Sequence, residues 1–158
     1  MARPYLGGST AGVVDVTADK TLVKADSGKI MSLNTSSAIT VTLPTDANVH
    51  TGFTVKFIVQ TANDNAYTIK TGDIADSGGD DMVGGVILAS TTAGYAHAVL
   101  PAANDCNIVL DANLADTGGE VGSWIELVKI AADQWMVSGC VYSDDADSDG
   151  TALFTDSD

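Results

Sequence analysis

Apolar and polar residues alternate one by one along much of this chain. The clearest runs are residues 39–43, 53–59, 67–70 and 125–127. Successive side chains of a β-strand point to opposite faces, so a period of two predicts strands with one face in a core and the other in water. Val, Ile, Thr and aromatic residues, which favour strands, fill these runs.

Clusters of Gly, Asp, Asn and Ser separate the runs, and these residues favour turns. Between them we expect about ten short strands. Their approximate ranges are 20–25, 29–33, 38–43, 53–60, 66–71, 85–90, 95–100, 106–110, 123–130 and 134–142. No window has the period of an amphipathic helix. The sequence therefore predicts an all-β domain, either an antiparallel β-sandwich of the jelly-roll kind or a β-barrel.

The last two expected strands, 123–130 and 134–142, are separated by a short turn and should form a hairpin. Trp124 and Trp135 lie one on each strand, and we expect both to be packing residues, with an exposed aromatic in a ligand groove as the alternative. A length of 158 residues favours one domain with extensions. We interpret residues 1–12 as an N-terminal arm, 13–142 as the β-domain and 143–158 as an acidic C-terminal tail.

The net charge is −14, which disfavours nucleic acid and anionic membranes as partners, because both are bound through clustered Lys and Arg. The chain has no run of about 20 apolar residues that would cross a bilayer. Its first residues also lack the apolar segment of a signal peptide, so we expect synthesis in the cytoplasm of the producing cell.

The sharpest local motif lies in the acidic tail. Carboxylates at alternate positions followed by Gly150 are typical of the start of a calcium loop. The candidate ligands are Asp145, Asp147, Asp149 and Asp156. The twelfth position holds Asp156 where such a loop usually has Glu, so we expect a solvated acidic tail with no cofactor, and a calcium loop is the alternative. Leu153 and Phe154 interrupt this stretch, and we expect them to dock on the same subunit or on another one.

Catalytic signatures are lacking. His50 and His97 are near no recognisable nucleophile motif, so we expect no enzyme. Cys106 and Cys140 lie in apolar contexts and are predicted to be free and buried, with a disulfide as the alternative. A second group of carboxylates is interpreted as turn chemistry. It comprises Asp73, Asp76, Asp80 and Asp81.

Three segments together resemble a β-module of tailed-phage virion proteins. These are Ala25–Asn34 with its Asp-x-Gly-Lys turn, Ala38–Pro44 ending in Leu-Pro, and Gly52–Phe57 opened by Gly. The hairpin segments Gly122–Leu127 and Gln134–Gly139 are similar to the last hairpin of that module. The start, Ala2–Gly8, resembles small structural proteins of marine cyanobacterial phages. The resemblance implies a capsid decoration (cement) protein or a tail-fibre domain, commonly a homotrimer.

We therefore expect a non-enzymatic virion protein, assembled in the host cytoplasm, that binds the major capsid protein and copies of itself on the capsid surface. The arm is expected to make the capsid contact. Its candidate binding residues are Arg3, Pro4, Tyr5 and Leu6. The alternatives are a receptor-binding or glycan-binding adhesin module, and a small glycosidase or lyase.

Overall fold

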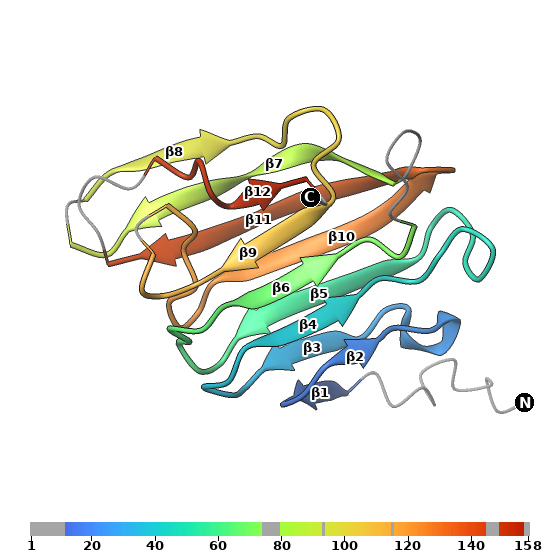
Figure 1. Ribbon diagram of the computed structural model, residues 1–158, viewed down its shortest axis with the longest axis horizontal. Coiled ribbons are helices and arrows are strands. Elements are labelled where there is room, and N and C mark those ends of the chain that lie inside the picture. Colours follow the sequence, from blue (N-terminus) through green and yellow to red (C-terminus); the bar gives the residue numbers. More distant parts are fainter. Residues whose placement is uncertain (1–11, 74–79, 93, 115, 145–148, 157–158) are drawn as a thin grey trace, which may run out of the picture.

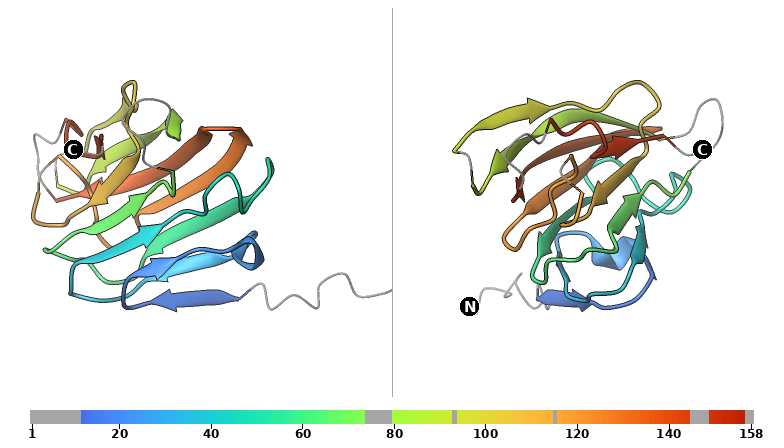
Figure 2. Two further views of the ribbon diagram at one scale, coloured as in Figure 1. Left: turned by 45° about the vertical axis from the view of Figure 1, so that its right-hand side comes forward. Right: turned by 60° about the vertical axis from the view of Figure 1, so that its left-hand side comes forward.

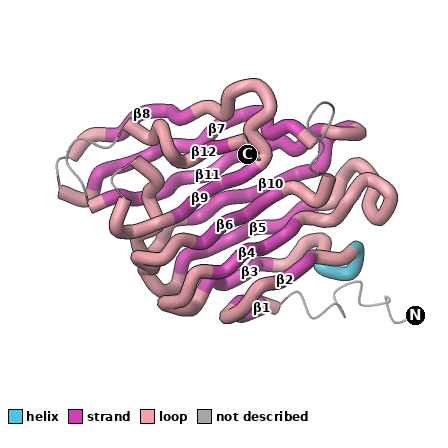
Figure 3. Tube along the Cα trace, viewed as in Figure 1, coloured by secondary structure: helices cyan, strands magenta, loops and turns pink. Residues whose placement is uncertain are grey.

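The computed structural model describes residues 12–73, 80–92, 94–114, 116–144 and 149–156. These residues form two β-sheets packed face to face, seen in Figure 1 and in the two turned views of Figure 2. The only helix among them is a three-residue 3-10 turn, η1 (Lys24–Asp26), coloured cyan in Figure 3. No described helix has the length and apolar composition that a membrane crossing requires.

The larger sheet has seven strands and the smaller one has five. In spatial order, the seven-stranded sheet consists of β1 (Val13–Val16), β3 (Ile30–Leu33), β5 (Thr54–Val59), β10 (Trp124–Ala131), β11 (Gln134–Ser143), β7 (Asp81–Ser90) and β8 (Ala96–Val99). The five-stranded sheet consists of β12 (Phe154–Thr155), β9 (Asn107–Leu110), β6 (Tyr67–Lys70), β4 (Ile39–Thr42) and β2 (Lys20–Thr21).

The first six strands alternate between the two sheets. β1, β3 and β5 are parallel neighbours in the larger sheet, and β2, β4 and β6 are parallel neighbours in the smaller one. The chain therefore crosses from layer to layer in three stacked rungs, a layout that Figure 1 shows from blue to green. Each rung places an apolar side chain on the one before it, as Phe57 is placed on Met31.

The prediction of an all-β sandwich is confirmed, but the expected antiparallel direction is wrong for half of the described strand pairs. Five of the ten described strand pairs are parallel, including the ten-residue pair of β7 and β11. Alternation specifies which face of a strand is buried, whereas the direction of its neighbour depends on how the chain returns. All ten expected ranges contain a strand, and the structure adds β1 and β12.

The core fills the space between the two sheets. β5 shows the alternation directly, since Val55, Phe57 and Val59 are buried while the residues between them are partly exposed. Tyr67 from the smaller sheet and Trp135 from the larger one are the largest fully buried aromatic side chains. Burying each such side chain contributes about 1.5–3 kcal/mol, so the two inner faces account for the pairing of the sheets.

The end of the chain also belongs to the sandwich. Leu153 is fully buried and Phe154 is 6% exposed, and Phe154 pairs with Ile108 of β9. β11 continues to Ser143, one residue beyond the boundary expected for the domain. The acidic segment is therefore fastened to its own subunit by a short strand and two apolar side chains.

Candidate functional site

Lys129 is the charged residue that the alternation of β10 carries into the core. Ile125 and Leu127 are buried on one face of this strand, and Lys129 is next on the same face. It is 2% exposed, although a buried ammonium without partners would be strongly unfavourable. Its position therefore depends on the groups that surround its Nζ.

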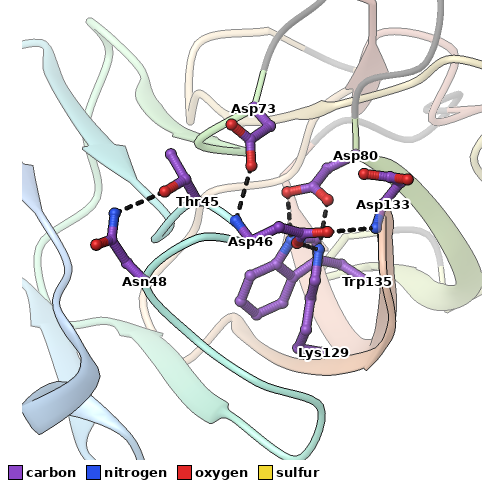
Figure 4. A network of polar contacts seen from close by, with 8 residues as sticks. All are labelled: Thr45, Asp46, Asn48, Asp73, Asp80, Lys129, Asp133 and Trp135. Atoms are coloured by element: carbon purple, nitrogen blue, oxygen red, sulfur yellow. Dashed lines mark hydrogen bonds and ion pairs between the residues drawn. The ribbon is translucent and has the colours of Figure 1, made fainter.

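Two carboxylates form ion pairs with Lys129 Nζ, as Figure 4 shows. Asp80 lies just before β7 and its side chain is fully buried, whereas Asp46 lies between β4 and β5 and its side chain is 27% exposed. The indole N–H of Trp135 donates to Asp80 Oδ2 at 2.9 Å. Lys129 and Trp135 are paired across the β10–β11 hairpin, so the hairpin register places both against Asp80.

A shell of backbone contacts holds Asp46 in this position. Its N–H donates to Asp73 Oδ2 at 2.7 Å, and its own Oδ2 accepts from the N–H of Asp133 at 2.9 Å. Asp133 has a φ of 54° in the turn between β10 and β11, a conformation that Asp tolerates better than most residues. The site therefore joins three loops that are far apart in the sequence.

The three charged groups differ in how they titrate. Burial raises the pKa of the Asp80 carboxyl above its usual value, against the hydrogen bonds from Lys129 and Trp135. Burial acts the same way on Asp46, but the contact with Lys129 and the Asp133 N–H lower its pKa overall. Burial would lower the pKa of Lys129, and its bonds to Asp46 and Asp80 raise it instead. Asp46 is therefore the carboxylate that balances the positive charge of Lys129, and Asp80 is the carboxyl that accepts a proton more readily.

A small cavity of about 250 Å³ opens beside this group. It is lined by Asp46, Val49, His50 and Lys129 among others, but not by Asp80. Carboxylate oxygens of Asp46, Asp80 and Asp133 come within 4.8 Å of one another, a spacing that suits a metal ion. The ammonium of Lys129 already supplies a positive charge to two of them, so the structure gives no separate reason for a metal there.

The outer face of the seven-stranded sheet has the opposite character, because apolar side chains on it face solvent. One row runs in register across five neighbouring strands, from β5 to β8. It comprises Ile58, Trp124, Cys140, Ile87 and Ala98. A second row comprises Val128, Met136 and Val83. Ile87 is 44% and Met136 is 40% exposed. We call these eight residues the outer apolar face.

Charge on this part of the sheet is balanced. Lys56 and Glu126 are paired across β5 and β10, between the two apolar rows. Lys56 Nζ also lies 4.1 Å from the centre of the Trp124 ring. Trp124 is therefore half-buried under a lysine on the outside of the sheet, and the expectation that it packs in the core is wrong. The hairpin places the two tryptophans on opposite faces.

The residues predicted from the sequence are scattered. Arg3, Pro4, Tyr5 and Leu6 lie outside the described residues, as do Asp145 and Asp147. Asp149 Oδ1 accepts from the N–H of Thr151 at 3.1 Å, and the backbone oxygen of Asp156 accepts from the Asn107 side chain.

Of the two histidines and two cysteines, only His50 lies near the buried site, where it lines the adjoining cavity. Cys106 is buried and Cys140 is half-buried on the outer apolar face, and neither forms a disulfide bond. His97 lies on β8 and stacks on Tyr95, with ring centres 5.8 Å apart.

The sequence analysis did not predict the buried site, although the inward position of Lys129 could have been predicted. Extending the alternation of Ile125 and Leu127 by two residues predicts that Lys129 points inward. Asp80 was interpreted as turn chemistry because it lies in an acidic cluster, and that interpretation is wrong. Its partner lies 49 residues away, and no local pattern encodes that distance.

Comparison with protein-family models, curated proteins and solved structures found no match to this chain. A function for this chain is therefore inferred from its fold, from the buried charged group around Lys129 and from the outer apolar face.

Proposed function

We propose that this chain is a structural protein of a virus particle, a capsid decoration protein that binds neighbouring protein subunits through the outer apolar face. The observation that supports this most is the in-register row of Ile58, Trp124, Cys140, Ile87 and Ala98 across five strands. Contiguous apolar surface that faces solvent is typical of a protein interaction site.

Charge distribution supports the choice of this face. The whole chain has a net charge of −14, so most of its surface repels both copies of itself and other acidic proteins. One balanced pair, Lys56 and Glu126 on β5 and β10, lies between the two rows of the outer apolar face. Contact through this face buries apolar area without bringing like charges together. The acidic remainder then faces solvent and keeps the assembly soluble.

Rigidity supports the choice of a structural role. The binding face lies on strands whose other side is a packed core, so it has little freedom to lose on binding. The expected partners are the major capsid protein and copies of the same chain, with the homotrimer implied by the resemblance to phage virion proteins. Binding only the assembled shell stabilises that shell by mass action.

The test is whether the chain is a component of particles, and through which face. Particles from the organism that encodes the chain are purified on a density gradient and searched for its peptides by mass spectrometry. Purified chain is then added to particles that lack it. We expect the unmodified chain to bind and Ile87→Lys to lose most of its binding.

Val121→Lys is the matched control, because Val121 is 60% exposed but lies in a loop outside the outer apolar face. It should bind as the unmodified chain does. Absence of the chain from particles would refute the virion role. Equal binding by both variants would place the contact elsewhere on the molecule.

A further inference from the structure

A primary amine and two carboxyl groups are enclosed together in the core at the β10–β11 hairpin. Lys129 is 2% exposed and Asp80 is 1% exposed, and the two side chains are in direct contact. Asp46 contacts the same Nζ from the side that reaches the cavity. Each group is drawn in Figure 4, where the two carboxylates converge on the lysine nitrogen.

We infer that Lys129 and Asp80 form a covalent side-chain amide, an isopeptide bond, and that Asp46 relays the protons of this reaction. The bond would join Lys129 Nζ to Asp80 Cγ. This inference concerns the chemistry of the core and does not rest on the proposed virion role.

The reaction balances without any further reagent. Nζ forms a bond to Cγ, and the bond between Cγ and Oδ1 breaks. Of the three protons of the Lys129 ammonium, one stays on the amide nitrogen and two leave with Oδ1 as water. Asp46 accepts these two protons from Nζ one after the other, delivers each to Oδ1, and is a carboxylate again at the end. Asp80 Oδ2 becomes the amide oxygen.

Each neighbouring group suits a step of this reaction. The fold holds the amine against the carboxyl, so the reaction avoids the entropy cost of bringing the two groups together in solution. The Trp135 N–H donates to Oδ2, the oxygen on which negative charge develops when Nζ attacks. The raised pKa of Asp80 favours the neutral acid, which an amine attacks more readily than a carboxylate. The raised pKa of Lys129 keeps Nζ protonated, so the attack requires a base that removes a proton first. Asp46 is within reach of Nζ, as a general base must be.

The surroundings also favour the product. Two opposite charges held in the core have lost much of their hydration, and a neutral amide has no such requirement. Phe53 packs edge-on against Trp135, with ring centres 5.7 Å apart, and helps to enclose the site. The released water has a nearby exit, because the adjoining cavity of about 250 Å³ is lined by both Lys129 and Asp46.

The bond would connect parts of the sheet that are not neighbours. β11 lies between β10, which carries Lys129, and β7, which Asp80 precedes. The amide would close a loop of the chain between residues 80 and 129, which includes β7, β8 and β9. Separation of β7 from β11 would then be opposed by a covalent link as well as by backbone hydrogen bonds.

The full-length chain offers a direct test, because Glu120 and Glu126 are its only glutamates. The purified chain is denatured, reduced and cleaved after glutamate. Asp80 then lies on fragment 1–120 and Lys129 on fragment 127–158. We expect the two fragments to stay joined and the intact mass to be one water below that of the sequence. Reduction is essential, since Cys106 and Cys140 also lie on these two fragments.

Separate fragments and a mass equal to that of the sequence would overturn the inference, whatever the variants do. Lys129→Arg and Asp80→Ala should each abolish the joined product, and a joined product in either would overturn the assignment of residues. Asp46→Ala should slow its formation about a hundredfold. Asp15→Ala is the matched control, because Asp15 is an exposed carboxylate on β1, which β3 and β5 separate from β10, and it should react as the unmodified chain does. An unchanged rate in Asp46→Ala would refute the proton relay.

Discussion

The two faces of the seven-stranded sheet each carry residues of the kind usually found on the other, charged residues inside and apolar residues outside. Its inner face buries a lysine and an aspartate near the β10–β11 turn, and its outer face exposes Ile87 and Met136. The buried charges have partners within the chain, whereas the outer rows leave Ile87 and Met136 partly exposed to solvent. The comparison teaches that the buried charges are satisfied within one chain, and we propose that the outer apolar face serves contacts between chains.

The largest difference is expected between the two tryptophans of the hairpin. Trp135→Ala should lower the free energy of unfolding by about 3–5 kcal/mol, because it leaves a cavity in the core and removes the N–H donor to Asp80. Trp124→Ala, on the outer face, should cost only about 1 kcal/mol, the scale of its contact with Lys56. Urea unfolding of both variants measures this, and equal losses would contradict the assignment of faces.

The two lysines of the same sheet should differ almost as much. Lys129→Met leaves Asp80 buried without its cation and should cost about 3–5 kcal/mol in urea unfolding. Lys56→Met removes a partly exposed charge and should cost less than about 1 kcal/mol. A small loss in Lys129→Met would mean that the buried group contributes little to the fold.

A smaller effect is expected at Asp26, which ends η1 and forms an ion pair with Lys29. Asp26 accepts from the Val23 N–H at 3.0 Å and from Lys29 Nζ at 2.8 Å. Burial opposes the shift, but these bonds and the charge of Lys20 lower the pKa of Asp26 below its usual 3.8. Its folded-state pKa is thus lower than its unfolded one, so its contribution is complete above the unfolded value and is lost as the pH falls through the folded one.

Asp26→Asn should therefore be less stable than the unmodified chain by about 1–2 kcal/mol at pH 7. The difference should shrink as the pH is lowered below about 4. Thermal unfolding at several pH values measures it. A difference that grows toward acid would give the opposite sign and would refute the lowered pKa.

The smallest effect on stability, and the largest on association, is expected for Ile87→Lys. Ile87 is 44% exposed, so the variant should unfold within about 0.5 kcal/mol of the unmodified chain. Light scattering at several concentrations should show that the unmodified chain self-associates and that Ile87→Lys is a monomer. A monomeric unmodified chain would exclude self-association through this face.

Residues that repeat a local rule were predicted well, and residues that depend on distant partners were not. The run from Val55 to Val59 has the alternation and the burial expected of it. β12 escaped prediction because it has two residues in an acidic stretch and is held by β9. Trp124 is out of phase with the buried Ile125 and Leu127, so the alternation already places it outside. The hairpin register then pairs Trp135 with the buried Lys129, inside the sandwich.

The sequence by itself determined that this chain forms strands, where most of them lie and which of their residues face a core, because alternation and turn chemistry act between neighbouring residues. The tertiary structure decided that half of the described strand pairs are parallel, that Lys129 meets Asp80, and that eight apolar side chains lie in two rows on the outer face of one sheet. These features arise from the return path of the chain and from strand register, and both bring together residues that the sequence keeps far apart.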